Sequence, residues 1–423
     1  MLKGLLGSKL ASASLLLMIS MTVVNAGNYV YNLILGRWLG PALFADLSLI
    51  VTLLLVVTFI TVPLQMTTAR YAAIHSADGD AAALSQVRRF TALTALGFGL
   101  ALTAAFTLGA PLWQGFFHTA SAWPFVIFGL AMPFSLLQGV ERGVLQGQTR
   151  FGILAVTYQV EMWTRLLLGV GLVALGLSVN GAVLGVSLSF VATWLAARLA
   201  VKKLPAAPPP DRETRAAILA FALPVLVSQL GQILINNSDV LLVRRFHEAE
   251  TAGQYAALAL IGRIVFFATW SVVTTMFPIV AQRQKKGEPH RHLLWVSLGI
   301  VAGISTPIIL AALFFPEFIV TLLFGPQYLG VARLLWLYAL ATSLYALANV
   351  VINYRLSLGM GRETRFALAA GAAQVLGIVL FHETLAQVVW VQVAVMAALF
   401  ILLLAYNFLS HQRESAAKLT EAI

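Results

Sequence analysis

Residues 90–140 read FTALTALGFGLALTAAFTLGAPLWQGFFHTASAWPFVIFGLAMPFSLLQGV, a stretch without an aspartate, glutamate, lysine or arginine. A membrane-spanning helix needs about 20 apolar residues, so the stretch is long enough for two spans. Residues 111–124 begin and end with proline and hold the turn between them. Because lipid offers no hydrogen-bond partners to the backbone, a helix or a closed barrel must form each span.

The composition of the whole chain agrees with this interpretation. Of 423 residues, 60% are hydrophobic and 10% are charged, and the mean hydropathy is +0.89. A soluble domain carries about 25% charged residues, so this chain cannot cover a water-facing surface. Its apolar runs are much longer than the roughly ten residues of a barrel strand. We therefore predict an all-α polytopic membrane protein.

Apolar windows of spanning length predict twelve transmembrane helices. The first segment loosely resembles a cleaved signal peptide, but residues 10–36 carry no charge and are long enough to span. We therefore predict a retained first helix. The expected spans lie near residues 11–35, 43–70, 90–112, 122–146, 152–177, 181–201, 215–243, 252–282, 292–315, 331–356, 365–382 and 386–409.

The basic residues between these spans alternate from one side of the membrane to the other. Nearly all of them fall on one side, in short clusters that account for the net charge of +11. By the positive-inside rule, that side is cytoplasmic and includes both termini. Clusters of this kind suit anionic lipid rather than nucleic acid. We predict a multi-pass protein of the inner (cytoplasmic) membrane, whose outer side receives only Arg37, Arg244 and Arg245.

A proline-rich polar segment divides the chain into two similar halves. We expect an N-terminal six-helix bundle at 1–203, a cytoplasmic linker at 204–214 and a C-terminal six-helix bundle at 215–423. Parallel repeats place a substrate site at the interface between the halves, which favours transport over a non-transporting scaffold. Matches 215 residues apart are Pro63 with Pro278, Pro111 with Pro326, 149–151 with 364–366, and Gln159 with Gln374; Asn28 matches Asn236 at a spacing of 208.

Polar side chains follow one face of the first helix and one face of the seventh. Amides within a membrane either hydrogen-bond neighbouring helices or line a cavity. Because the two stripes occupy matching positions in the repeat, we favour the wall of a shared cavity. The stripes consist of Asn25, Asn28 and Asn32 in the first helix and of Gln229, Gln232, Asn236 and Asp239 in the seventh.

Charged side chains within the spans are the other candidate site residues. Glu161 and Arg165 stand four residues apart on one helix and can form an ion pair. Arg263 lies near the middle of its span without an acidic residue one turn away, so it faces either an anionic ligand or a partner on another helix. Glu141, Arg142 and Arg355 lie near helix ends, where we expect them to extend toward lipid headgroups.

Sequence signatures of enzymes are missing. There is no cysteine, no metal-spaced histidine cluster, no nucleotide-binding glycine loop and no pair of nucleophile and base. We therefore expect a protein that is not an enzyme and that uses no cofactor or metal.

Several short segments resemble polysaccharide flippases. They are NLILGRWLGP at 32–41, FADLS at 44–48, GVLQGQTRF at 143–151 and LFGPQY at 323–328. Together with the helix count and the repeat, they identify a resemblance to the oligosaccharide-lipid flippases (Wzx type) of the multidrug/oligosaccharidyl-lipid/polysaccharide exporter superfamily. The resemblance extends over nearly the whole chain.

The resemblance implies a MATE-like V-shaped pair of pseudo-symmetric six-helix bundles that alternate between inward-open and outward-open states. The cargo would be an undecaprenyl-pyrophosphate-linked oligosaccharide for O-antigen, capsule or exopolysaccharide synthesis, moved from the cytoplasmic to the periplasmic leaflet. Arg263, followed by Arg165, would bind the pyrophosphate, and the amides would contact sugars. Membrane lipids would surround the protein, and a polysaccharide polymerase and glycosyltransferases are candidate partners. Related lipid II flippases carry two further helices, which argues against the peptidoglycan precursor as cargo.

Two alternatives stay open at this point. A cation-coupled multidrug exporter of the same superfamily would need acidic groups in its cavity, and the spans contain only Asp46, Glu141, Glu161 and Asp239. A scaffold that assembles a glycan-synthesis complex would need no cavity at all.

Overall fold

The computed structural model describes residues 2–359 and 364–421, and within these ranges every element is a helix. This confirms the predicted all-α class. The elements are α1 (Leu2–Ala77), α2 (Ala81–Thr107), α3 (Ala110–Phe117), α4 (Trp123–Leu130), α5 (Met132–Gly147), α6 (Phe151–Leu172), the π-helical turn η1 (Val173–Leu177), α7 (Ser178–Ala200), α8 (Arg212–Phe246), α9 (Ala249–Gly262), α10 (Ile264–Lys285), α11 (Arg291–Phe314), α12 (Pro316–Leu323), the 3-10 helix η2 (Pro326–Leu334), α13 (Leu335–Ser357), α14 (Thr364–Leu380) and α15 (Leu385–Glu421). The basic residues on the predicted cytoplasmic side include Arg362, which lies outside the described ranges.

The twelve predicted spans can be traced onto these helices. Within the described residues, nine helical runs are long and apolar enough to cross a membrane. Two of them, Leu16–Ala77 with 62 residues and Phe151–Ala200 with 50, are long enough for two crossings each. The shorter apolar helix Arg365–Leu380 supplies the last one.

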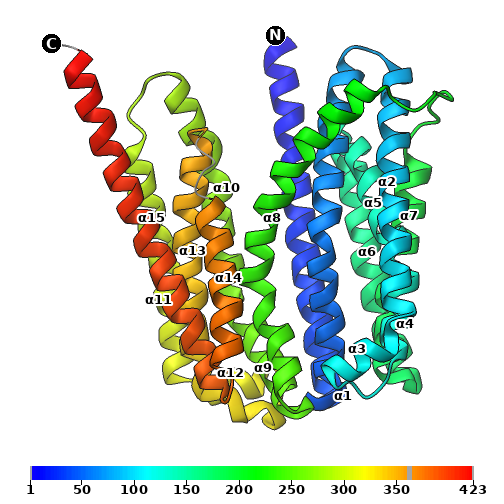
Figure 1. The fold of residues 1–423 in the computed structure, drawn as a ribbon, viewed down its shortest axis with the longest axis vertical. Helices are drawn as coiled ribbons and strands as arrows, with labels where there is room; N and C mark the ends of the chain where they lie inside the picture. Colours follow the sequence, from blue (N-terminus) through cyan, green and yellow to red (C-terminus); the bar gives the residue numbers. More distant parts are fainter. Residues whose placement is uncertain (1, 360–363, 422–423) are drawn as a thin grey trace. The chain divides into compact units, whose positions relative to one another are not determined.

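Glycines make the turns inside the two longest runs. In α1 the chain reverses at Gly40, whose φ of 73° and ψ of 170° are open to glycine and strained for other residues. Pro41 follows, and a proline cannot donate the hydrogen bond that would continue the helix. Gly176, with a φ of 91°, bends the chain between α6 and α7 in the same way. Figure 1 shows the two arms of α1 meeting at a turn next to the α1 label.

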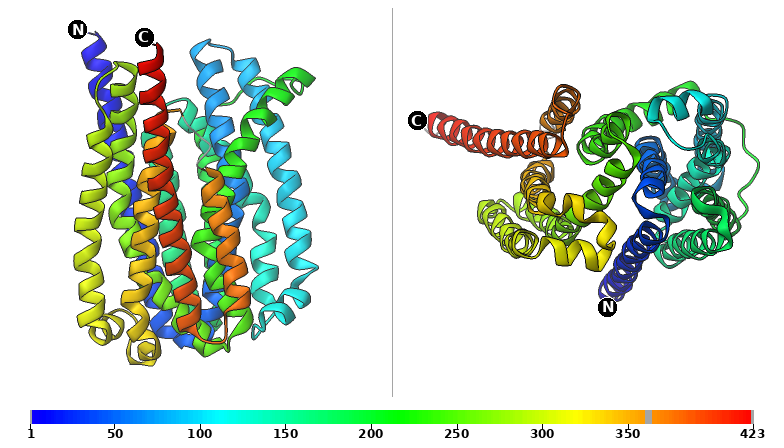
Figure 2. Two further views of the ribbon diagram at one scale, coloured as in Figure 1. Left: turned by 60° about the vertical axis from the view of Figure 1, so that its left-hand side comes forward. Right: turned by 90° about the horizontal axis from the view of Figure 1, so that it is seen from below.

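The chain forms two compact units, Met1–Gln229 and Leu230–Ile423. In the first, α1 packs against α5 and α6, and α6 packs against α7. In the second, α13 packs against α10, α11 and α15, and its side chains are largely buried. The long helices of each unit pack against one another, and Figure 2 shows them from the side and from below. The predicted bundle limits at 203 and 215 stay a prediction.

Matching glutamines in the two halves make matching contacts. Gln159 Nε2 donates to the carbonyl oxygen and the hydroxyl of Ser20 in α1, at 3.0 and 2.9 Å. Gln374 Nε2 donates to the carbonyl oxygen of Ile235 and the hydroxyl of Ser238 in α8, at 2.9 and 3.1 Å. Each glutamine therefore ties its helix to the first long helix of its own half, as an internal repeat predicts.

Candidate functional site

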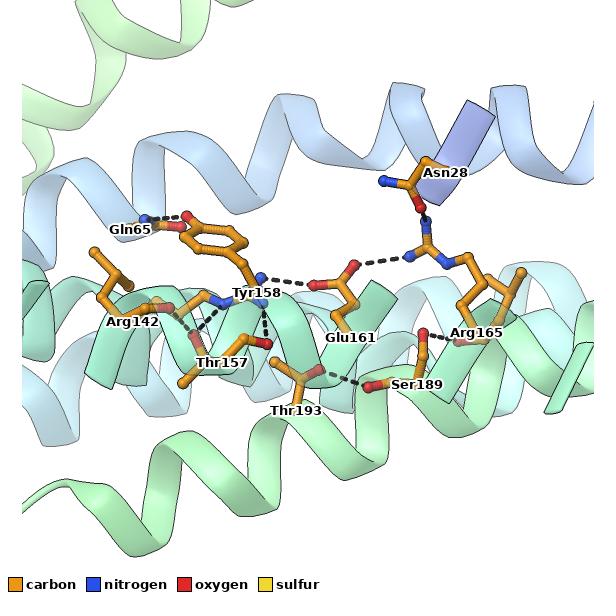
Figure 3. Close-up of polar contacts among 11 residues, drawn as sticks. Asn28, Gln65, Arg142, Thr157, Tyr158, Glu161, Arg165, Ser189 and Thr193 are labelled. Carbon is orange, nitrogen blue, oxygen red and sulfur yellow. Dashed lines mark hydrogen bonds and ion pairs between the residues drawn. The ribbon is translucent and has the colours of Figure 1, made fainter. Parts of the chain in front are cut away.

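Two arginines share one glutamate within the membrane part of the first unit. Arg142 comes from α5, and Glu161 and Arg165 come from α6 (Figure 3). The Nη1 atom of Arg142 lies 2.8 Å from Glu161 Oε2, and the Nη2 atom of Arg165 lies 2.7 Å from Glu161 Oε1. We call these three residues the Arg–Glu–Arg cluster. The predicted ion pair between Glu161 and Arg165 is confirmed, and Arg142 is an unexpected third member.

Arg142 is fixed on every side of its guanidinium. Its Nε donates to the Thr157 hydroxyl at 3.1 Å, and its Nη2 donates to the Thr157 carbonyl oxygen at 3.0 Å. The group stacks on the Tyr158 ring, 3.9 Å from its centroid. Tyr158 is held in turn because its hydroxyl accepts a hydrogen bond of 3.1 Å from Gln65 on α1. Arg142 thus supports the cluster as a rigid, buried cation.

Arg165 is less fully bonded than Arg142. Its Nη1 donates to Asn28 Oδ1 on α1 at 3.1 Å, so one of the predicted amides belongs to this cluster. Its Nε atom is buried and has no hydrogen-bond partner within the described part of the chain. A guanidinium has five N–H donors, and a buried donor without a partner is costly. Arg165 therefore keeps one donor uncommitted, which makes it the candidate of the three for an anionic ligand.

The charges of the cluster do not balance. Two arginines and one carboxylate leave a net charge of +1 among side chains that are at most 18% exposed. An uncompensated charge removed from water is strongly destabilising unless another group neutralises it. Guanidinium groups in such a place bind phosphate or carboxylate through charge-assisted hydrogen bonds. The excess positive charge makes the cluster a candidate anion site.

The second unit contains a balanced charge pair. Arg263 Nη2 lies 3.2 Å from Oδ1 of the fully buried Asp239 on α8. The other carboxylate oxygen accepts hydrogen bonds from Tyr255 at 3.0 Å and from Tyr338 at 2.8 Å. Gln392 Nε2 donates to the Tyr255 hydroxyl at 2.6 Å. Of the two explanations that the sequence left open for Arg263, the structure supports a partner on another helix.

A small cavity adjoins this pair. Its volume is about 20 Å³, enough for one water molecule, and its walls include Asn236, Arg263 and Gln392. Asn236 donates to the Gln232 carbonyl oxygen at 2.7 Å and to the Tyr345 hydroxyl at 3.5 Å. Asn32 in the first unit donates to the Asn28 carbonyl oxygen at 2.8 Å. These hydrogen bonds of Asn32 and Asn236 each lie within one unit. A cavity wall shared by the two stripes stays a prediction.

Three charged residues near helix ends differ from expectation. Glu141, Arg142 and Arg355 are only 3–5% exposed, so the prediction that they extend toward lipid headgroups is wrong. Glu141 accepts a hydrogen bond of 3.0 Å from Arg88, and Arg355 donates one of 3.3 Å to Asn407. Each pairing joins two different helices, and spacing along one helix cannot reveal it. The roles of Tyr255, Tyr338 and Gln392 were missed for the same reason.

Comparison with known proteins gives a family and a fold. The sequence matches the family described as "Polysaccharide biosynthesis protein" over residues 10–284, which is more than half of the chain. No curated protein sequence matches significantly.

Solved transporter structures resemble the whole chain. An inward-facing multidrug resistance MATE family transporter of the MOP superfamily has a TM-score of 0.80 at 16% identity, covering 92% of this chain and 95% of its own. The lipid II flippase MurJ in an inward closed conformation has a TM-score of 0.73 at 13% identity, covering 93% and 87%. An MOP superfamily transporter from Pyrococcus furiosus has a TM-score of 0.64 at 18% identity, covering 96% of both chains.

The family match confirms the resemblance to polysaccharide flippases found in the sequence. The solved structures agree with the helical architecture, since the structural neighbours include a multidrug transporter and a lipid II flippase. The chain is accordingly a multi-pass α-helical membrane protein and not an enzyme, and it belongs to the polysaccharide biosynthesis protein family.

Proposed function

We propose that this protein flips an undecaprenyl-pyrophosphate-linked oligosaccharide from the cytoplasmic to the periplasmic leaflet by alternating access. Membership of the polysaccharide biosynthesis family supports a glycan cargo. The fold, shared with multidrug transporters and with a lipid II flippase, supports movement of an amphipathic molecule. The glycan would become part of a surface polysaccharide. Glycosyltransferases would act before the flip and a polymerase after it.

The observation that carries this proposal is the excess positive charge of the Arg–Glu–Arg cluster. A pyrophosphate presents several oxygens that suit the planar donor fork of a guanidinium. It would also supply the negative charge that the cluster lacks. Arg165, with its buried Nε donor, would contact the phosphate directly, while Glu161 and Arg142 hold the guanidinium in place.

The remaining candidate residues take secondary roles in this proposal. Arg263 is a second phosphate ligand whose charge Asp239 already neutralises, so it contributes less than Arg165. The amides are assigned to sugar hydroxyls, because amides can both donate and accept hydrogen bonds. These residues are Asn28, Asn32, Gln232 and Asn236.

Flipping of a fluorescent lipid-linked oligosaccharide in reconstituted vesicles tests the proposal. We expect Arg165→Ala to lower the rate more than tenfold, since it removes charge-assisted hydrogen bonds to the phosphate. Arg165→Lys keeps the charge but loses the fork, so it should retain an intermediate rate. Arg198→Ala removes the same charge from a side chain that is 43% exposed, and it should flip at the wild-type rate.

The result also separates this function from cation-coupled drug export. Within the described residues, both Glu161 and Asp239 are paired with arginine, which favours an anionic cargo over a cationic one. If Arg165→Ala flips the lipid at the wild-type rate and at normal protein abundance, the cluster has no part in the mechanism. Absence of flipping by the wild-type protein, together with efflux of a cationic dye, would establish the drug exporter instead.

A further inference from the structure

A groove opens between α2 and the linker that joins α7 to α8, within the first unit. Its volume is about 360 Å³, within the range of small-ligand sites. The α2 side chains that line it lie on one face of the helix, because they are spaced by three and four residues. They are Ser85, Arg88 and Arg89 toward the start of the helix and Ala92, Leu93 and Leu96 beyond them.

The linker is tied down at the polar end of this groove. The Ser85 hydroxyl donates to the Pro205 carbonyl oxygen at 2.7 Å, and Arg89 Nη1 donates to the Ala207 carbonyl oxygen at 2.9 Å. Proline has no backbone N–H, so the proline-rich linker offers few donors of its own. These two bonds fix the linker backbone as one wall of the groove.

Positive charge is in excess at the same end. Arg88 Nε donates to Glu141 Oε2 at 3.0 Å, and Arg198 Nε lies 3.9 Å from Oε1 of that carboxylate. Arg89 follows Arg88 in the chain and adds a third guanidinium, so these four side chains carry a net charge of +2. Within the described residues, Arg89 makes only its one hydrogen bond to Ala207, so most of its five donors can serve a ligand.

The groove changes from charged to apolar along α2. At 1.5 Å per residue, about 10 Å separates the Arg89 and Leu96 positions. Leu93 is 56% exposed, on a helix that is apolar enough to cross the membrane. A phospholipid has the same polarity pattern, with a phosphate above an acyl chain. The predicted topology places this end at the cytoplasmic leaflet, which carries anionic lipid.

We infer that this groove binds one anionic phospholipid, with its phosphate on Arg89 and Arg88 and an acyl chain along Leu93 and Leu96. The surplus charge selects the headgroup. A zwitterionic lipid carries the same phosphate, but its ammonium group would face Arg88 and Arg89, the two arginines that line the groove. The site is independent of the flipping function proposed above, because it uses none of the residues assigned to the cargo.

Native mass spectrometry of the full chain, titrated with phosphatidylglycerol or phosphatidylcholine, tests this inference. We expect one tightly bound phosphatidylglycerol, with at least tenfold weaker binding of phosphatidylcholine. Arg89→Ala should weaken phosphatidylglycerol about tenfold, the effect of losing a charge-assisted hydrogen bond. Arg89→Lys should retain most of the binding. Ala92→Trp should also weaken it, because the ring fills the groove without changing the charge.

The control is Arg365→Ala, which removes one exposed arginine at the start of α14, outside the groove. It should bind phosphatidylglycerol like the wild-type protein. Equal binding of the two lipids would show an apolar groove without headgroup recognition and would overturn the inference. Displacement of the lipid by equimolar inorganic phosphate would show a site for free anions. Undiminished binding to both Arg89→Ala and Ala92→Trp would place the lipid elsewhere.

Discussion

The arginines Arg165 and Arg263 have different partners, and this difference decides how strongly each can bind a phosphate. Arg165 belongs to a cluster with a net charge of +1, whereas Arg263 forms a neutral pair with Asp239. Phosphate binding gains most where the protein leaves positive charge uncompensated. We therefore expect Arg165→Ala to reduce flipping more than Arg263→Ala does, measured in vesicles at matched protein content. The reverse order would return the main phosphate role to Arg263.

Asp239 should be more important for stability than for recognition. It is fully buried and accepts hydrogen bonds from Arg263, Tyr255 and Tyr338. Asp239→Asn leaves the arginine as an unpaired charge, and breaking such a buried pair costs about 3 kcal/mol or more. We expect a clear drop in the thermal unfolding midpoint in detergent. The double variant Asp239→Asn/Arg263→Gln should recover much of it, and no recovery would contradict the pairing.

Individual helices could be predicted well from the sequence, but the contacts between them could not. Apolar length reveals each span because the thickness of the membrane sets it. The pair of Glu161 and Arg165 was predictable because four residues make one turn of a helix. The contact of Arg142 with the same glutamate joins α5 to α6 and depends on how those helices pack. Burial of Arg142 and Glu141 near helix ends was unpredictable for the same reason.

The reversal inside α1 gives a prediction at the scale of the element. A Cβ at Gly40 would meet nothing within 4 Å, so alanine there adds backbone strain alone. With φ at 73° and ψ at 170°, that strain amounts to about 1–3 kcal/mol. Gly97 in α2 is an equally open but helical position, where alanine should be neutral or stabilising by up to about 1 kcal/mol. Thermal unfolding should distinguish Gly40→Ala from Gly97→Ala, and equal midpoints would show that the bend tolerates any residue.

At the scale of the whole molecule, the two halves of the repeat share packing contacts but differ in their charged residues. Gln159 and Gln374 bind the first long helix of their halves in the same way. Glu161 and Arg165 correspond to Leu376 and Leu380, both of which are exposed and apolar. The six-helix fold does not need the cluster, since the second half forms without it. The asymmetry therefore supports a function for the Arg–Glu–Arg cluster rather than a structural role.

The orientation of the chain in the membrane is the last prediction. The charge distribution places the termini and the linker in the cytoplasm and residues 244–250 outside. The chain has no cysteine, so single cysteines can be introduced without background labelling. Ala206→Cys in the linker and Glu248→Cys before α9 both occupy exposed positions. In intact cells, an impermeant thiol reagent should label Glu248→Cys and leave Ala206→Cys unmodified until the membrane is opened. Labelling of Ala206→Cys from outside would invert the topology and, with it, the proposed direction of transport.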